Sequence, residues 1–493
     1  MEIREYPNLY IGGEWVKPHS DNVIESYDPS TGQVWATVPS ADEVDVQNAV
    51  DAARVALKGP WRSVSATEKG EMLYRLSELI LENIEYLSNL ESKDNGKPIR
   101  DTRGEITRAA GWIRYFAGFA DKVVGSTIPY RPNTSAYTRR EPVGVVAAIT
   151  PWNSPISMYS WKLGPALATG NAVILKPAEQ TSVTAFEIAK LVEKAGFPAG
   201  VVNVIPGYGE TAGRALVQNK GVNKISFTGE HRTALRIMKD STSSFKRMSF
   251  ECGGKSPHIL FEDCDLERAL TVATHSAFRS TGQSCSLGSR LFVQRPIYER
   301  AISRLKGRVA GIRVGMPLDE KTHIGPQTSK EQLEKTLRYI QLGKEAGAKL
   351  QIGGSRLEAP EFRNGYFVQP TIFSDVHNDW KVAQDEIFGP VLCIIPFDNE
   401  EEVLQMANDT IYGLVAGVWT KDIGKAHRMI ENLESGLVSV NTYRPVYWNL
   451  PYGGVKMSGL GREHGYAVLN EYTEYKTVVI DYSPNEPKDP FAN

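Results

Sequence analysis

The sequence predicts an α/β protein built on mainly parallel sheets. Between residues 141 and 251, short apolar runs alternate with segments whose apolar positions repeat at helical spacing. The same alternation returns between residues 265 and 436. Strands that alternate with helices form parallel sheets covered on both faces, because each helix carries the chain back to the start of the next strand. The 493 residues suffice for about two to four domains.

The N-terminal part is expected to be helical before the first sheet begins. Residues 41–58 and 66–93 carry apolar side chains at helical period. Four apolar runs bounded by glycine or polar residues then predict the first sheet. The expected strands are Val143–Ile149, Asn171–Leu175, Val201–Ile205 and Lys224–Phe227, and the expected helices are Trp161–Thr169, Thr181–Ala195, Glu210–Gln218 and His231–Lys239.

The second block continues the alternation and ends in a strand. We expect helices at 265–280, 296–308, 329–347 and 400–407, and strands at 290–294 and 391–396. The segment Glu474–Tyr482 is expected to be a terminal strand. A strand isolated at a chain end usually pairs with another element, often in a second subunit.

Polar residues and glycines follow each strand of the first sheet. Ligands of parallel sheets bind beyond the carboxyl ends of the strands, so a site is expected there. The segments in question are Thr150–Asn153, Lys176–Glu179, Pro206–Gly209 and Thr228–Glu230.

The composition excludes several classes of protein. Lys and Arg number 56 against 58 Asp and Glu, a net charge of −2, which lacks the basic excess of a nucleic-acid-binding protein. No apolar run approaches the roughly 20 residues of a membrane-spanning helix, and the N-terminus lacks a signal-peptide core. We therefore expect a cytoplasmic protein with reduced thiols and with neither nucleic acid nor membrane as a partner.

One of the four cysteines stands out as a nucleophile. None is spaced as CxxC, so no metal site is expected. Cys285 lies in the polar stretch Thr-Gly-Gln-Ser-Cys-Ser, whereas Cys393 lies inside an apolar strand and Cys264 is flanked by acidic residues that oppose thiolate formation. Cys285 is therefore the best candidate, although no histidine is near it in sequence.

Three further segments each admit two interpretations. The glycine-rich turn 206–213 has the spacing GxGxxxG, which fits a dinucleotide fingerprint imperfectly and fits a tight turn equally well. Lys176 and Glu179 could bind ribose hydroxyls or form a solvated pair. Glu251 precedes two glycines, which permit a close approach into a cleft, or it is a solvated hinge carboxylate.

Together these segments resemble the aldehyde dehydrogenase superfamily over nearly the whole chain. Six motifs occur in the order and spacing of that family. They are TPWNSP (150–155), KPAEQT (176–181), ECGGKSP (251–257), FRSTGQSC (278–285), EIFGP (386–390) and PYGGVKMSG (451–459).

The resemblance implies three structural parts. The first is a Rossmann-like NAD-binding domain, residues 1–120 and 142–253. The second is an α/β catalytic domain, residues 254–455, and the third is a small β oligomerisation element, residues 121–141 and 470–493. Dimers and tetramers are usual in the family, so a homodimer or homotetramer is expected.

The resemblance also implies NAD-dependent oxidation of a small-molecule aldehyde to a carboxylic acid. Cys285 matches the thiol that attacks the aldehyde and later carries the thioester. Asn153 matches the amide that forms an oxyanion hole with the backbone N–H of Cys285. Glu251 matches the general base that activates water to hydrolyse the thioester.

The cofactor residues follow from the same motifs. Lys176 and Glu179 match the pair on the adenosine ribose, and Glu386 with Phe388 matches the group at the nicotinamide ribose. Glu179 favours NAD over NADP, because its charge would repel a 2′-phosphate. The rest of the implied groove is Thr150, Trp152, Gly209 and Gly229.

The chain departs from the family pattern at three positions. Glu230 stands where serine is usual beside the pyrophosphate, Ala234 where glycine is usual, and Cys252 where leucine is usual. A carboxylate near a phosphate costs Coulomb energy unless it points away or pairs with Arg232 or His231. We therefore expect weaker NAD binding than in relatives with serine.

The substrate is expected to be a medium-sized apolar or aromatic aldehyde. Arg279 and Arg444 stand where neutral residues are common, so an ω-carboxy semialdehyde bound by either arginine is the alternative; both arginines could instead be solvated or salt-bridged. The other positions expected to line the substrate tunnel are Met158, Trp161, Ser284, Ser286, Val446 and Tyr452.

Three rival functions are considered. A CoA-acylating aldehyde dehydrogenase commonly lacks the glutamate at the position of Glu251. A thiol hydrolase would not need Lys176, Glu179 and Glu386. A binding protein that has lost catalysis would not need Cys285.

Overall fold

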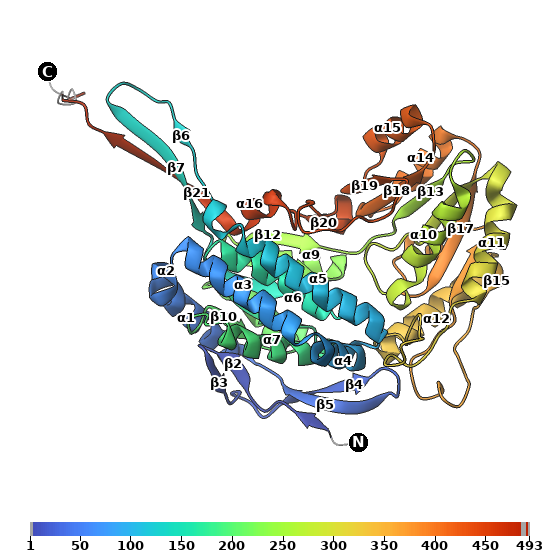
Figure 1. Cartoon of the computed structure of the whole chain (residues 1–493), viewed down its shortest axis with the longest axis horizontal. Helices are drawn as coiled ribbons and strands as arrows, with labels where there is room; N and C mark the ends of the chain where they lie inside the picture. Colours follow the sequence, from blue (N-terminus) through green and yellow to red (C-terminus); the bar gives the residue numbers. More distant parts are fainter. Residues whose placement is uncertain (1–2, 485–489, 492–493) are drawn as a thin grey trace.

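The computed structural model describes residues 3–484 and 490–491. Residues 1–2, 485–489 and 492–493, which belong to the segments 1–120 and 470–493 considered above, lie outside the described part. Two large sheets with helices on both faces form the body of the molecule, and a narrow arm extends from it (Figure 1). The expected α/β class with parallel sheets is confirmed.

The first large sheet has eight strands in the order β20-β12-β11-β8-β9-β10-β2-β3. The five strands from β12 to β10 are mutually parallel, and the edge strands β20, β2 and β3 are antiparallel to their neighbours. Their bounds are β2 Leu9–Ile11, β3 Glu14–Val16, β8 Val145–Ile149, β9 Ala172–Lys176, β10 Val202–Val204, β11 Lys224–Thr228, β12 Arg247–Glu251 and β20 Gly459–Leu460.

Helices cover both faces of this sheet. Alternate side chains of β8 and β9 enter two different cores, as the period of two along a strand requires. One core is formed with α3 Ala66–Glu82, α5 Ile99–Ala117, α6 Pro155–Ala168 and α7 Val183–Lys194, and the other with α1 Glu43–Lys58, α8 Arg214–Gln218 and α9 His231–Asp240.

Three of the expected helical segments differ from the helices in the structure. Residues 66–93 form two helices, α3 and α4 (Ile84–Asn95), because the chain leaves helical geometry at Asn83, with φ −109° and ψ 17°. Helix α6 begins at Pro155 rather than Trp161, since proline suits the first helical position and every residue of this helix is buried. The segment expected as one helix at 210–218 opens with a π-helical turn, Gly209–Gly213, before α8.

The second large sheet has seven strands in the order β15-β16-β17-β14-β13-β18-β19. All are parallel except the edge strand β15. The strands are β13 Pro257–Leu260, β14 Arg290–Gln294, β15 Lys349–Ile352, β16 Thr371–Ser374, β17 Val391–Phe397, β18 Val415–Trp419 and β19 Leu437–Val440. The helices are α10 Leu266–Phe278, α11 Tyr298–Ala310, α12 Lys330–Glu345, α13 Lys381–Gln384, α14 Glu400–Asn408 and α15 Ile423–Asn432.

The segment 252–256 carries the chain from β12 of the first sheet directly to β13 of the second. It contains the Cys-Gly-Gly part of the ECGGKSP motif, which begins at Glu251, the last residue of β12. The crossing therefore brings this motif to the junction of the two sheets, where the other motifs gather.

Two smaller sheets complete the fold. Near the N-terminus, β1 Arg4–Glu5, β5 Gln33–Pro39 and β4 Val23–Asp28 pair with one another. The arm in Figure 1 consists of β6 Thr127–Ile128, β7 Thr134–Pro142 and β21 Thr473–Asp481. The expected terminal strand is confirmed, and its partner is β7 of the same chain, in an antiparallel register from Thr473 opposite Pro142 to Asp481 opposite Thr134.

Within the described part of the chain, no helix combines the length and the apolar character that crossing a membrane requires.

Candidate active site

Cys285 lies on a strained turn that follows α10. Ser280 and Thr281 adopt left-handed φ angles of 52° and 56°, a conformation that costs free energy for residues with a side chain. Surrounding contacts hold it: Thr281 Oγ1 donates to the carbonyl of Gly325 at 3.0 Å. A Cβ at Gly282 would lie 2.2 Å from the carbonyl carbon of Gly389, so the turn packs directly on the EIFGP motif.

The Cys285 thiol is protonated at neutral pH. Burial, together with the nearby carboxyls of Glu386 and Glu251, raises its pKa to about 11, and Tyr452 and Arg444 act in the opposite direction. The sulfur lies 3.8 Å from the Tyr452 hydroxyl. Forming the nucleophilic thiolate therefore requires removal of a proton from a buried group.

Asn153 reaches the loop that carries Cys285. Its Nδ2 donates to the carbonyl of Gln283, two residues before the thiol, at 3.0 Å. A hydrogen bond holds the segment around Asn153 to the end of α4, because Asn95 Nδ2 donates to the carbonyl of Trp152 at 2.6 Å. An amide donor is thus held against the loop that carries the thiol.

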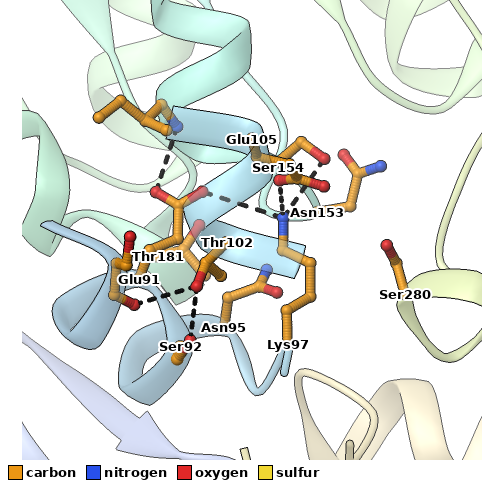
Figure 2. A network of polar contacts seen from close by, with 12 residues as sticks. Glu91, Ser92, Asn95, Lys97, Thr102, Glu105, Asn153, Ser154, Thr181 and Ser280 are labelled. Atoms are coloured by element: carbon orange, nitrogen blue, oxygen red, sulfur yellow. Dashed lines mark hydrogen bonds and ion pairs between the residues drawn. The ribbon is translucent and has the colours of Figure 1, made fainter. Parts of the chain in front are cut away.

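A buried polar network supports this segment (Figure 2). Lys97 hydrogen-bonds to Glu105, approaches Glu91 at 3.9 Å and donates to Ser154 Oγ at 3.5 Å. Glu91 Oε2 in turn accepts from the backbone N–H of Ile156 at 3.3 Å. The network connects α4 and α5 to the start of α6, immediately after Asn153.

Sequence reasoning missed this network. The sequence nevertheless contains an indication of it. Glu91 lies one helical turn after the buried Leu87, and α4 ends at Asn95, two residues before Lys97. A charged residue at a position otherwise expected to be buried indicates a paired interior charge.

Glu251 ends β12 and points into the protein with 4% of its surface exposed. Its Oε2 has no hydrogen-bond partner among the described residues. Burial, assisted by Glu463, raises the pKa of Glu251 well above its ordinary value. A Cβ at Gly453 would lie 2.9 Å from Glu251 Oε1, so the PYGGVKMSG motif borders this carboxyl.

The side chain of Glu386 packs against the two glycines of the ECGGKSP motif. Its Oε1 accepts from the backbone N–H of Gly254 at 3.1 Å. A Cβ at Gly253 would lie 2.1 Å from Glu386 Oε2, which explains why a residue without a side chain stands there. Burial raises the pKa of Glu386 to about 7. Nearby, the rings of Phe388 and Trp152 meet edge to face with centroids 5.2 Å apart.

The carboxyl ends of β9 and β11 offer groups suited to a dinucleotide. Lys176 Nζ lies 3.9 Å from Glu179 Oε2, and burial lowers the pKa of this lysine. Thr150, at the end of β8, donates its N–H to the carbonyl of Lys176 at 3.1 Å. Thr228 Oγ1 is buried with no hydrogen-bond partner among the described residues, which leaves a polar atom for a ligand just before the N-terminus of α9.

Two glycines of the expected groove occupy different settings. Gly209 opens the π-helical turn, and a Cβ there would meet no atom within 4 Å. At Gly229 a Cβ would lie 2.4 Å from the Phe227 ring. The groove is therefore closely packed at the second glycine and open at the first.

The unusual Glu230 points outward. Its side chain is half-exposed and lies 3.7 Å from Arg232, one of the two partners expected for it. His231 instead contacts the Tyr412 hydroxyl at 3.4 Å. Ala234 is buried in the core beneath α9, where Cys252 also packs.

The apolar residues expected in the substrate tunnel come together. Met158, Trp161 and Tyr452 are buried in one cluster, and Cys285 and Val446 pack against it. The rings of Trp161 and Tyr452 meet edge to face with centroids 5.6 Å apart.

The two expected arginines lie beside a separate polar cavity of about 170 Å³. Arg444 Nη1 donates to Ser284 Oγ at 2.8 Å and to Ser286 Oγ at 3.0 Å. Arg279 forms a 3.9 Å ion pair with Glu105. The structure therefore places both arginines at one cavity, and their role towards the substrate stays a prediction.

A half-buried thiol with an amide donor and two buried carboxyls, at the junction of two α/β units, is the set of groups that enzymes with a cysteine nucleophile use. The family model described as "Aldehyde dehydrogenase family" matches residues 15–478. The chain belongs to the aldehyde dehydrogenase family.

Relatives of known sequence and structure span the whole chain. An aldehyde dehydrogenase of Emericella nidulans is 44% identical over 471 residues, 95% of this chain and 94% of its own length. The NAD⁺ complex of an aldehyde dehydrogenase from Bacillus cereus superposes with a TM-score of 0.94 at 43% identity, covering 98% of this chain and 97% of its own. A betaine aldehyde dehydrogenase from Staphylococcus aureus, also in complex with NAD⁺, gives 0.96 at 36% identity, with coverages of 99% and 97%.

Proposed function

We propose that the protein oxidises a small aldehyde to the carboxylic acid, with NAD as oxidant and Cys285 as nucleophile. The observation that carries the proposal is the convergence of Cys285, Asn153, Glu251 and Glu386 at the junction of the two large sheets. The relatives solved with NAD⁺ support the choice of cofactor.

The residues of the groove fit NAD. Lys176 and Glu179 would hold the adenosine ribose, and Glu386 would hold the nicotinamide ribose above Gly253. The unpaired hydroxyl of Thr228 suits a phosphate at the N-terminus of α9. When bound, NAD supplies a hydride acceptor. Glu179 disfavours NADP through repulsion of a 2′-phosphate.

The first chemical stage uses Cys285 and Asn153. The thiol passes its proton to a solvent water, and the resulting thiolate sulfur bonds to the carbonyl carbon while the electron pair of the C=O bond moves to the oxygen, which becomes an oxyanion. Asn153 Nδ2 and the backbone N–H of Cys285 donate to that oxygen, and one such donor contributes about 3–4 kcal/mol to the transition state. Loss of hydride from the carbon restores the C=O bond and leaves a thioester on Cys285.

The second stage uses Glu251. Its buried carboxylate accepts a proton from water, the resulting hydroxide attacks the thioester carbon, and the Cys285 sulfur leaves. A raised pKa makes Glu251 a stronger base once it is ionised. Its presence supports hydrolysis rather than acyl transfer to CoA.

The body of the substrate would contact the cluster of Met158, Trp161, Val446 and Tyr452. This apolar and aromatic wall favours a medium-sized chain or ring next to the carbonyl.

The decisive test is NAD reduction, followed by NADH absorbance, across aliphatic and aromatic aldehydes. We expect turnover without added CoA, and none in Cys285→Ala. Ester hydrolysis with no NAD reduction for any aldehyde would instead favour a hydrolase.

We also propose that the arm mediates a homodimer or homotetramer. Tyr475, Val479 and Ile480 of β21 are 61%, 51% and 49% exposed, and β21 presents an unpaired edge to solvent. Light scattering of the intact chain should give a multiple of the monomer mass, and Val479→Asp with Ile480→Asp should lower it. A monomeric intact chain would contradict this proposal.

A further inference from the structure

Three arginines from distant parts of the sequence gather beside Cys285. Arg108 comes from α5, Arg279 follows α10, and Arg444 follows β19. Arg279 and Arg444 line the 170 Å³ cavity together with Ser284, which precedes Cys285, and Ser154, which follows Asn153. We call Arg108, Arg279 and Arg444 the arginine cluster.

The cluster is short of negative charge. Among the described residues, neither Arg108 nor Arg444 has an ion-pair partner, and the one carboxylate paired with Arg279 is Glu105 at 3.9 Å. Glu105 is already hydrogen-bonded to Lys97. Asp101 is the second carboxylate whose charge acts on Arg279 and Arg108. Two carboxylates, of which Glu105 lines the cavity, therefore face the three arginines and Lys97.

The mutual repulsion within the cluster is considerable. Burial and then the charge of Arg279 lower the pKa of both Arg108 and Arg444. Holding like charges together in a partly buried site costs free energy, and a bound anion removes that cost. A purely structural role would instead pair each arginine with its own carboxylate.

Arg444 is also held in place. Its Nη1 is fixed by the hydroxyls of Ser284 and Ser286, on either side of Cys285. Its backbone adopts a left-handed φ of 52°, which the loop after β19 must maintain. A guanidinium anchored to the residues that flank the nucleophile can bind a substrate group only a few bonds from the reacting carbonyl.

Resting on the proposed function, we propose that the arginine cluster binds a carboxylate at the far end of the substrate, so that the preferred substrates are short ω-carboxy aldehydes. The aldehyde carbon lies at Cys285, the intervening carbons contact the Trp161 and Tyr452 wall, and the carboxylate accepts hydrogen bonds from Arg444 and Arg279. Arg108 adds long-range attraction.

The test compares matched aldehydes with and without the carboxylate. The pairs are 5-oxopentanoate against pentanal, and 4-carboxybenzaldehyde against 4-methylbenzaldehyde. We expect the wild-type kcat/KM to favour the carboxylate in at least one pair by about tenfold to a hundredfold, as charge-assisted hydrogen bonds would give. Equal values in both pairs would overturn the inference while leaving the proposed function intact, whereas no NAD reduction with any aldehyde would overturn the proposed function itself.

Variants assign the preference to the cluster. Arg444→Leu and Arg279→Leu should each lower the carboxylate-to-neutral ratio at least tenfold, mainly through KM, and Arg444→Lys should retain part of it. Arg304→Leu, an exposed arginine on α11, is the matched control and should keep the wild-type ratio. An unchanged ratio in both cluster variants would contradict the assignment.

A second measurement does not depend on the variants folding. Pentanoate, which is not the product formed from 4-methylbenzaldehyde, should inhibit oxidation of that aldehyde by the wild-type enzyme competitively, and pentan-1-ol at the same concentration should inhibit at least tenfold less. Equal inhibition by the two compounds would overturn the proposal.

Discussion

Replacing Glu91 by glutamine should make the protein more stable, and by an amount that grows with pH. Glu91 is fully buried in the network below Asn153, and burial raises its pKa from 4.5 to about 7 even though Lys97 opposes the shift. Because the pKa is higher in the folded state than in the unfolded state, Glu91 is still protonated in the folded protein at pH values where it has already ionised in the unfolded chain. The contribution of Glu91 to stability is therefore complete below pH 4.5 and is lost as the pH rises towards 7.

The size of the effect follows from the shift. At 1.36 kcal/mol per pH unit, a rise from 4.5 to about 7 corresponds to about 3 kcal/mol above pH 7. Glutamine has the shape of the protonated glutamic acid and can still accept the bond from the N–H of Ile156. Glu91→Gln should therefore match wild type near pH 4.5 and exceed its unfolding free energy by about 3 kcal/mol at pH 8.5.

Urea unfolding followed by tryptophan fluorescence at pH 5.5, 7 and 8.5 measures this difference. Glu71→Gln, an exposed position on α3, is the control and should show no pH-dependent change. A difference between Glu91→Gln and wild type that is constant across the three pH values, or that shrinks as the pH rises, would refute the reasoning.

Three further results are expected. The rate at which iodoacetamide labels Cys285, measured by peptide mass spectrometry, should keep rising up to pH 10, because burial raises the pKa of this thiol to about 11. Glu386→Gln should increase that rate severalfold at pH 8, and a labelling rate that is constant above pH 7 would contradict the expectation. Glu230→Ser should change the Kd of NAD, measured calorimetrically, by less than about threefold, because this half-exposed carboxylate lies 3.7 Å from Arg232; a tenfold tightening would show that the carboxylate acts on the phosphates. Gly253→Ala should displace the Glu386 carboxyl, since the new Cβ would lie 2.1 Å from Oε2, and should lower NAD-dependent turnover more than tenfold at an unchanged thermal midpoint; wild-type turnover would refute it.

The four strands expected in the first sheet were predictable because each is a short apolar run buried on both faces. Three interior strands of the second sheet, β13, β16 and β18, were not expected. The four expected strands of the first sheet match β8, β9, β10 and β11 to within three residues at either end. Edge strands escaped notice since they are short: β20 has two residues and β2 has three. Helix α5 was missed because Arg103, Gly104 and Arg108 interrupt its apolar pattern, although its other face is deeply buried.

The candidate site was predictable as a set of residues but not as an arrangement. Motif order identified Cys285, Asn153 and Glu386, whereas their mutual geometry depends on the crossing from β12 to β13 and on the turn after α10. The pairing of Lys97 with Glu91 and Glu105 could not be foreseen, because charged residues are ordinarily exposed. Their burial becomes evident only when α4, α5 and α6 are packed together.

The register of β21 against β7 has a consequence for biosynthesis. Thr134 lies opposite Asp481, and β20, which borders β12, begins only at Gly459. Both pairings join segments that are made early to segments that are made more than 200 residues later. Such distant contacts form slowly and only after the loop between them has been closed. During synthesis, β12 and β7 therefore each keep one unpaired edge until the C-terminal strands have been made, and this interval is the stage at which the chain is most exposed to aggregation.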